Sequence, residues 1–238
     1  AGFDILVTLR ERSPFSASLI ARLPNLKLFS MMGMRATTID FKALAARGIP
    51  ITYTAGADNG ASTAELTLAL ILAAVRRIPA GDAAMRRGGF LDGIPAGFEL
   101  HGKTLGLVGL GKLGGRVAGY GRALQMDVIG WSPNLTPEKA AAAGATAVSK
   151  EELFSRADVI SLHLVLSDRS RGIIGADDLG RMKKGAVIVN TSRGPLIQEA
   201  ALIAALKTGN IIAGLDVYDR EPLQADHPFR TLPNTVLT

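Results

Sequence analysis

The chain alternates short apolar runs with segments in which apolar positions recur every three or four residues. This alternation predicts buried strands that are each followed by a helix. The strand candidates up to residue 97 lie at 5–7, 26–29 and 51–53, and the helical patterns lie at 15–22, 40–46 and 61–77. The sequence therefore predicts an α/β lobe at the start of the chain.

The alternation continues after a glycine- and proline-rich segment at 87–97, which we interpret as a hinge. Further helical patterns lie at 138–143, 150–155 and 199–207, and the strand candidates lie at 104–109, 127–131, 145–148, 158–163, 186–190, 211–217 and 235–237. Repeated strand and helix units require parallel strands. We therefore expect two domains, 1–97 and 98–238, and in the second a doubly wound parallel sheet that binds ligands beyond the carboxyl ends of its strands.

The most informative segment joins a strand candidate to a helix through three glycines. An apolar run ends at Val108, and Gly109, Gly111 and Gly114 follow with the spacing G-x-G-x-x-G before a helical pattern begins. The first glycine permits a tight turn, the second lets backbone N–H groups approach a pyrophosphate, and the third lets the helix pack close to the strand. This context favours a dinucleotide-binding turn over an ordinary structural turn.

Composition narrows the classes of function. With 238 residues, 47% of them hydrophobic, the chain can bury a sizeable core. The absence of cysteine excludes disulfides, a thiolate nucleophile and cysteine-ligated metals, and it fits a cytoplasmic protein. The three histidines are far apart and lack the spacing of metal ligands, so we expect no metal.

Charge and hydropathy argue against nucleic acid and membranes as partners. The net charge of +6 comes from scattered basic pairs without an interleaved aromatic stripe, which indicates a solvated surface that also favours anionic substrates. The apolar run 66–75 is too short to span a bilayer, so we expect a buried helix there. The first residues lack the pattern of a signal peptide.

Polar residues stand at or just after the ends of the strand candidates, at the edge where this fold binds ligands. The guanidinium of Arg193 suits a carboxylate or a carbonyl oxygen, although a solvated loop arginine fits the position equally well. Glu221 could orient a histidine in proton transfer, or it could be a turn carboxylate. Asp216 could touch a nicotinamide or cap a turn, and His163 could contact the cofactor or pack.

Together these segments resemble the D-isomer-specific 2-hydroxyacid dehydrogenases. The resemblance covers nearly the whole chain and rests on Gly-Leu-Gly-Lys-Leu-Gly at 109–114, Val-Asn-Thr-Ser-Arg-Gly-Pro-Leu at 189–196 and Leu-Asp-Val-Tyr-Asp-Arg-Glu-Pro-Leu at 215–223. The family includes phosphoglycerate dehydrogenases and glyoxylate/hydroxypyruvate reductases. The resemblance implies a Rossmann NAD(P)-binding domain, a smaller flavodoxin-like substrate lobe, and hydride transfer between NAD(P)H and a small 2-oxo or D-2-hydroxy acid.

The resemblance also implies roles for single residues. Arg193 would bind the substrate carboxylate and carbonyl, and Glu221 would pair with the catalytic histidine. A substrate-lobe loop would present backbone N–H groups to the carboxylate, although its methionines also suit core packing; this loop comprises Met32, Gly33, Met34 and Arg35. The residues expected at the cofactor are Gly109, Gly111, Lys112, Leu113, Gly114, Ser132, His163, Thr191 and Asp216.

The identity of the cofactor depends on the end of the second strand of the cofactor domain. Ser132 stands where NAD-preferring members of the family usually carry an acid for the ribose hydroxyls. No arginine follows to bind a 2′-phosphate. We therefore expect NAD, with NADP as the alternative.

The chain lacks the histidine that transfers the proton in this family. That residue follows the last strand in a Pro-His context, whereas this sequence stops at Thr238, and His227 precedes the strand and suits a loop or packing role. We therefore expect a chain truncated at both ends, with an incomplete substrate lobe, whose natural form continues past Thr238 with the histidine. The alternative is an inactive NAD(H)-sensing module that resembles transcriptional corepressors of this fold. The family resemblance also implies a homodimer.

Overall fold

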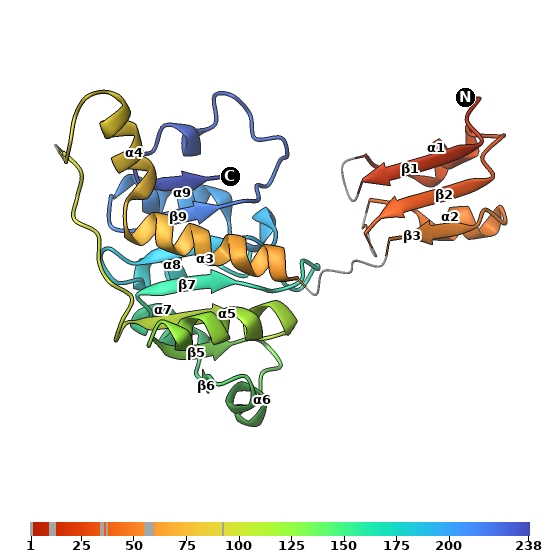
Figure 1. The fold of residues 1–238 in the computed structure, drawn as a ribbon. Helices are drawn as coiled ribbons and strands as arrows, with labels where there is room; N and C mark the ends of the chain where they lie inside the picture. The colour runs from red at the N-terminus through yellow and green to blue at the C-terminus, as the bar shows by residue number, and fades with distance from the viewer. Residues whose placement is uncertain (1, 10–12, 34–35, 37, 55–59, 92) are drawn as a thin grey trace. The chain divides into compact units, whose positions relative to one another are not determined.

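The computed structural model describes residues 2–9, 13–33, 36, 38–54, 60–91 and 93–238. Its contacts divide the chain into two compact units, Ala1–Asn59 and Gly60–Thr238. Both units are α/β and contain only parallel strand pairs among the described residues, as Figure 1 shows. The predicted α/β class with parallel sheets is therefore confirmed.

The first unit is a three-stranded sheet in the order β1-β2-β3 with two helices. Phe29 and Met31 of the central strand are fully buried with Ile20 and Leu44 of the two helices. The carboxylate of Asp40 accepts a hydrogen bond from the Ala43 N–H and so caps the second helix. The elements are β1 (Ile5–Leu9), α1 (Ala17–Ala21), β2 (Leu28–Met32), α2 (Phe41–Ala46) and β3 (Ile51–Tyr53).

The second unit is built on a seven-stranded sheet in the order β10-β9-β8-β7-β4-β5-β6. The chain runs outward from β4 in one direction and then in the other, which is the doubly wound arrangement that the sequence predicts. The strands are β4 (Thr104–Val108), β5 (Asp127–Trp131), β6 (Thr146–Ala147), β7 (Val159–Leu162), β8 (Val187–Asn190), β9 (Ile212–Leu215) and β10 (Thr235–Leu237). The helices are α3 (Ala61–Val75), α4 (Ile78–Arg86), α5 (Lys112–Ala123), α6 (Pro137–Ala142), α7 (Lys150–Arg156), α8 (Ala176–Arg181) and α9 (Glu199–Lys207), with single 3₁₀ turns at Gly194–Leu196 and Pro228–Arg230.

Helices cover both faces of this sheet and give it two hydrophobic cores. α3 and α5 pack together over one face, and the buried side chains there include Leu70, Leu107 and Val189. α7, α8 and α9 form the other layer over a core that includes Phe154 and Ile188. The strands β4, β7, β8 and β9 are therefore almost wholly apolar, because both of their faces are buried.

The longest described helix contains the apolar run 66–75. Its buried positions include Leu70, Ile71, Ala74 and Val75, which confirms the predicted buried helix. Within the described ranges, no helix has the length and hydrophobicity needed to cross a membrane.

The division between the two units differs from the predicted boundary near residue 98. α3 packs on α5, β8 and β9, so residues from Gly60 onward belong by their contacts to the second unit. Hydrophobic periodicity locates a helix but does not show which sheet it covers. The structure also contains α4 and α8, two helices that the sequence analysis did not single out.

Candidate functional site

The turn between β4 and α5 can be formed only by glycine at two of its three motif positions. Gly109 has a φ of 100°, and a Cβ there would lie 2.8 Å from the carbonyl carbon of His163. A Cβ on Gly114 would lie 2.2 Å from the carbonyl oxygen of Gly109. Both the tight turn and the close packing of α5 against it are therefore as the motif predicts.

The middle glycine of the motif faces open space. A Cβ on Gly111 would meet no atom within 4 Å, and the N-terminus of α5 carries no side-chain cap there. This open, uncapped helix start fits a pyrophosphate, which can accept hydrogen bonds from backbone N–H groups. Lys112 is the exposed first residue of α5, and Leu113 packs against Gly60 at the start of α3.

Six residues lie side by side just beyond the carboxyl ends of six neighbouring strands. The last residues of these strands are paired: Trp131 with Val108, Val108 with Leu162, Leu162 with Asn190, and both Asn190 and Leu237 with Leu215. The next residue of each strand forms what we call the edge row, which consists of Ser132, Gly109, His163, Thr191, Asp216 and Thr238. All of them except Thr238 are among the residues that the sequence predicts at the cofactor.

Backbone hydrogen bonds to neighbouring strands hold the edge row in place. The N–H of Gly109 donates to Trp131 O at 2.8 Å, that of His163 to Val108 O at 2.8 Å, and that of Asp216 to Asn190 O at 3.1 Å. The Asp216 carboxylate also accepts a hydrogen bond of 3.0 Å from the Thr238 hydroxyl. Ser132 is half-buried at the end of β5. The sheet therefore fixes these positions through its main chain.

His163 is a neutral member of the edge row. Its Nε2 lies 3.0 Å from the hydroxyl of Ser161, which is fully buried. Burial lowers the pKa of the His163 imidazole to about 4, because the charged ring would lose its hydration. A ring that stays neutral at physiological pH suits contact with a cofactor better than proton transfer.

The lowered pKa of His163 predicts a loss of stability in mild acid. The unfolded chain takes up the proton near pH 6.5 and the folded chain only near pH 4, so the free energy of unfolding should fall as the pH drops between these values. The expected contribution is on the order of 3 kcal/mol. Urea unfolding at several pH values, followed by the fluorescence of the single tryptophan Trp131, measures it.

The matched variants are His163→Gln and His101→Gln. The first removes the titrating group, so its unfolding free energy should fall less between pH 6.5 and 4 than that of the unsubstituted protein. The second changes an exposed histidine and should leave the pH profile unchanged. Equal profiles for the protein and for His163→Gln would show that the imidazole does not drive this acid sensitivity.

The hydroxyl of Thr191 forms a buried hydrogen bond with α3. Its Oγ1 lies 2.7 Å from Oγ1 of Thr67 in α3, and both side chains are buried. The Thr191 hydroxyl is therefore engaged in a contact with α3.

The loop that carries Arg193 is held by short polar side chains. Asn190 donates from Nδ2 to Arg193 O at 2.8 Å and accepts from the Ser192 N–H at 3.0 Å. The Ser192 hydroxyl donates to Leu164 O at 2.6 Å. Arg193 itself is exposed, and its Nη1 donates to Ser192 O at 2.7 Å. The backbone of Arg193 is thus fixed while its side chain lies at the surface.

A close contact brings the Arg193 loop to the loop that carries Glu221. A Cβ on Gly194 would lie 2.1 Å from the carbonyl carbon of Tyr218, so only glycine allows this approach. Glu221 is exposed, and its Oε1 accepts a hydrogen bond of 3.2 Å from the Tyr218 N–H. The structure therefore places the loops of the two predicted catalytic residues against each other.

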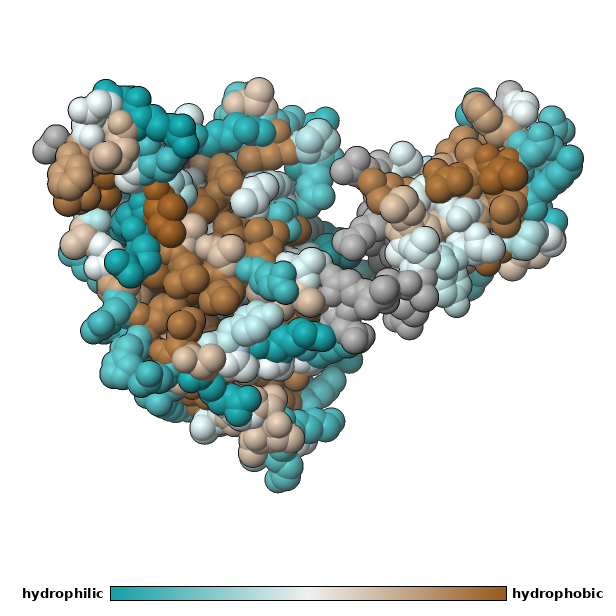
Figure 2. All heavy atoms as spheres, viewed as in Figure 1, coloured by the Kyte–Doolittle hydropathy of each residue, from teal (hydrophilic) through white to brown (hydrophobic). Residues whose placement is uncertain are grey.

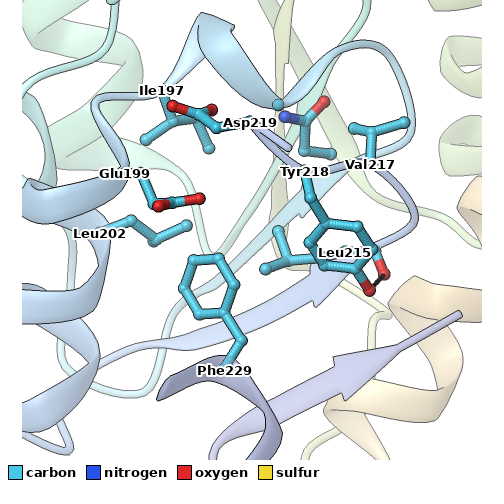
Figure 3. A pocket seen from close by; sticks show the side chains of 10 residues that line it. Ile197, Glu199, Leu202, Leu215, Val217, Tyr218, Asp219 and Phe229 are labelled. Carbon is cyan, nitrogen blue, oxygen red and sulfur yellow. Dashed lines mark hydrogen bonds between the residues drawn. The ribbon is translucent and has the colours of Figure 1, made fainter. Parts of the chain in front are cut away.

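A small pocket lies behind this contact (Figure 3), and neither Arg193 nor Glu221 lines it. Its lining includes Glu199 and Asp219, and burial together with the charge of Glu199 raises the pKa of the Asp219 carboxyl. His227 lies 3.3 Å from Glu199 and accepts a hydrogen bond from the Phe229 N–H on Nδ1. These contacts give His227 the loop and packing role expected of it.

The residues predicted to bind the substrate carboxylate belong to the first unit. Met32 ends β2 and is 48% exposed, so it is not a core residue in this unit. Gly33 has a φ of 106°, and its N–H donates to the Thr54 hydroxyl at 3.0 Å. Met34 and Arg35 lie outside the described residues.

Several residues that shape the site were missed in the sequence. Asn190 and Ser192 stand inside the quoted motif, and short polar residues just after a strand often bond to nearby backbone groups. Thr67 is a polar residue within the apolar run 66–75. A buried polar position in such a run signals a hydrogen-bonded partner, although it does not name that partner.

Comparison with known proteins finds extensive similarity. The D-3-phosphoglycerate dehydrogenase of Methanocaldococcus jannaschii is 40% identical over 237 residues, which cover 99% of this chain and 45% of that protein. The glyoxylate reductase of Aeropyrum pernix is 40% identical over 242 residues, which cover 98% of this chain and 72% of that protein. The chain thus spans less than half the length of the first relative.

Solved structures and a family model point to the same group. The crystal structure of the phosphoglycerate oxidoreductase of Vibrio cholerae aligns with a TM-score of 0.92 and 38% identity over 99% of this chain and 76% of that one. Residues 68–238 match the model of the D-isomer specific 2-hydroxyacid dehydrogenase, NAD binding domain. The second unit therefore carries this NAD-binding domain, and the chain belongs to the D-isomer-specific 2-hydroxyacid dehydrogenase family.

Proposed function

We propose that the protein is an oxidoreductase that interconverts a small 2-oxo acid and the D-2-hydroxy acid with NAD(H). The observation that carries the proposal is the juxtaposition of the glycine turn, the edge row and the interlocked loops of Arg193 and Glu221 at one sheet edge. Similarity to proteins named D-3-phosphoglycerate dehydrogenase and glyoxylate reductase supports the substrate class.

The chain's own residues bind and orient the reactants. NAD(H) supplies the hydride chemistry when it is bound. Arg193 would bind the substrate carboxylate with its planar fork of donors and polarise the adjacent carbonyl. Glu221 would pair with the catalytic histidine that the family resemblance implies, and it would stabilise the charged form of that imidazole.

Residues of the turn and the edge row would hold the cofactor. Gly109, Gly111 and Gly114, with Lys112 and Leu113 between them, would surround the pyrophosphate at the start of α5. At the edge row, Ser132 would face the adenosine ribose, Asp216 would lie at the nicotinamide end, and His163 and Thr191 would lie between them.

We further propose how the domains divide and where the protein works. The contacts of Gly60–Thr238 and the family match at 68–238 support a cofactor-binding domain that begins near Gly60 and not near residue 98. Residues 1–59 would form part of the substrate lobe, in which the loop at 32–35 would contact the substrate carboxylate. The absence of cysteine supports a cytoplasmic location.

The function is tested by the oxidation of NADH and NADPH with glyoxylate, hydroxypyruvate and pyruvate, measured on the complete gene product. We expect turnover with at least one of these acids. Binding of NADH without turnover of any acid would contradict the dehydrogenase and favour an NAD(H)-sensing module. Failure to bind either dinucleotide would contradict both.

We also propose a homodimer that buries the face formed by α3, α4 and the segment after α4. Figure 2 shows hydrophobic side chains gathered over α3, and a hollow on the second unit is lined by Leu72, Phe98 and Leu100, among others. Phe90 and Leu91 are 65% and 63% exposed. Such exposed apolar surface is typical of an interface.

The dimer predicts a mass that depends on this face. Sedimentation of the protein should give twice the mass of one chain, and Phe90→Ser with Leu91→Ser should shift it towards a single chain. The matched control is Val165→Ser, which changes an exposed apolar residue outside the α4 segment. A single-chain mass at micromolar concentration without any substitution would contradict the dimer.

A further inference from the structure

Most buried polar side chains of the second unit gather near the carboxyl edge of the sheet. Two of them, Thr67 of α3 and Thr191 of the edge row, are 124 positions apart in the sequence and share a hydrogen bond of 2.7 Å. Thr67 is 0% exposed and Thr191 6% exposed. A polar pair buried this deeply is an unusual feature in an otherwise apolar helix interface.

The direction of this hydrogen bond follows from the neighbouring one. The hydroxyl of Thr67 donates its single proton to Thr63 O at 2.8 Å. A threonine hydroxyl has one proton to donate, so in the bond between the two threonines Thr191 is the donor and Thr67 the acceptor. Loss of the Thr67 oxygen would leave the Thr191 hydroxyl buried without an acceptor, which is costly.

Thr191 is the first residue of the loop that ends in Arg193. The other hydrogen bonds of this loop join it to Asn190 and to Leu164, both at the sheet edge. The tie to Thr67 connects the loop to α3, which packs on the same strand. The hydroxyl of Thr67 therefore fixes the side chain of Thr191, which stands two residues before Arg193.

We propose that Thr67 is a positioning residue for Arg193. It fixes the side chain of Thr191, and through Thr191 it fixes the direction in which the guanidinium leaves the loop. The inference rests on the proposed function, because that function assigns substrate binding to Arg193. If this hydrogen bond were only structural, its loss would lower stability without affecting substrate binding and cofactor binding differently.

The test compares two substitutions at one position. Thr67→Val keeps the shape of the side chain and removes the acceptor, whereas Thr67→Ser keeps the hydroxyl. We expect Thr67→Val to raise the KM for the oxo acid about tenfold and to leave the Kd for NADH within about twofold. Thr67→Ser should stay within about twofold in both. In an Arg193→Ala background, Thr67→Val should change KM by less than about twofold, because no guanidinium remains to be positioned.

The matched control is Thr235→Val. The Thr235 hydroxyl lies 2.9 Å from both Phe229 O and Leu232 O at the start of β10, and these two carbonyls share its single proton. We expect this variant to be less stable and to keep both the KM and the Kd for NADH. Amide hydrogen exchange of the segment 190–196 should be faster in Thr67→Val than in Thr67→Ser or Thr235→Val.

The outcomes separate the inference from the proposed function. An equal KM in Thr67→Val and the unsubstituted protein, or an equal rise in KM and in the Kd for NADH, overturns the positioning role. If the unsubstituted protein binds NADH and reduces no oxo acid, the proposed function fails. The amide exchange rates then test whether Thr67 positions the loop that carries Arg193. Unchanged amide exchange at 190–196 in Thr67→Val would overturn this positioning role.

Discussion

Replacing Gly114 by alanine is expected to weaken NADH binding about 100-fold, which corresponds to about 2.7 kcal/mol. The added Cβ would lie 2.2 Å from the carbonyl oxygen of Gly109, and this contact is with backbone that no side-chain rotation can relieve. The helix α5 must therefore move away from β4, and the turn loses the geometry that suits a pyrophosphate. Unfolding should become easier by about 1–3 kcal/mol, as in other overpacked sites. Fluorescence titration with NADH and urea unfolding measure the two effects.

Neighbouring glycines provide the controls for this substitution. A Cβ on Gly115 meets no atom within 4 Å, so Gly115→Ala should keep NADH binding and gain up to about 1 kcal/mol from helix propensity. Gly111→Ala should change stability by less than about 0.5 kcal/mol and still weaken NADH binding, because its Cβ would occupy the open side of the turn. Equal NADH affinity in Gly114→Ala and Gly115→Ala would argue against a dinucleotide site at this turn.

Arg193→Lys is expected to lower kcat/KM for the oxo acid about 100-fold, or about 2.7 kcal/mol of transition-state stabilisation. Lysine keeps the positive charge but lacks the planar fork that binds a carboxylate and a carbonyl together. The Asn190 side chain holds the backbone of residue 193, so the loop should keep its conformation. The Kd for NADH should stay within about twofold, and steady-state kinetics with NADH titration separate the two quantities.

The control for charge and general surface effects is Arg181→Lys, at an exposed arginine that ends α8. This variant should match the unsubstituted protein in kcat/KM. Full activity in Arg193→Lys would show that a point charge is sufficient at this position. A parallel loss of NADH binding would instead assign Arg193 to the cofactor.

The sequence predicts the second unit well because its strands are buried on both faces. Strands such as Val187–Asn190 are short and mostly apolar, so the polar residues at their carboxyl ends stand out in the sequence. Parallel strands place these following residues at one edge, so Ser132, His163 and Asp216 could be expected together before their positions were known. Their roles in binding remain predictions.

Contacts between distant segments could not be predicted in the same way. The bond between Thr67 and Thr191 and the approach of Gly194 to Tyr218 both depend on tertiary geometry. The same holds for the division of contacts at Gly60, because the apolar run of α3 suits either sheet. Local patterns specify which elements form, whereas side-chain shape decides which surfaces meet.

In the edge row, the backbone fixes the position of a residue, and the side chain alone determines its chemistry. His163 and Asp216 are each held by a main-chain hydrogen bond to the neighbouring strand, and such a bond is available to almost any amino acid. A side chain at either of these two positions can therefore be exchanged without moving the backbone from which it acts. The connections that follow can likewise vary in length, because the sheet anchors both of their ends. The same frame is thus open to new specificities through changes in single side chains and loops.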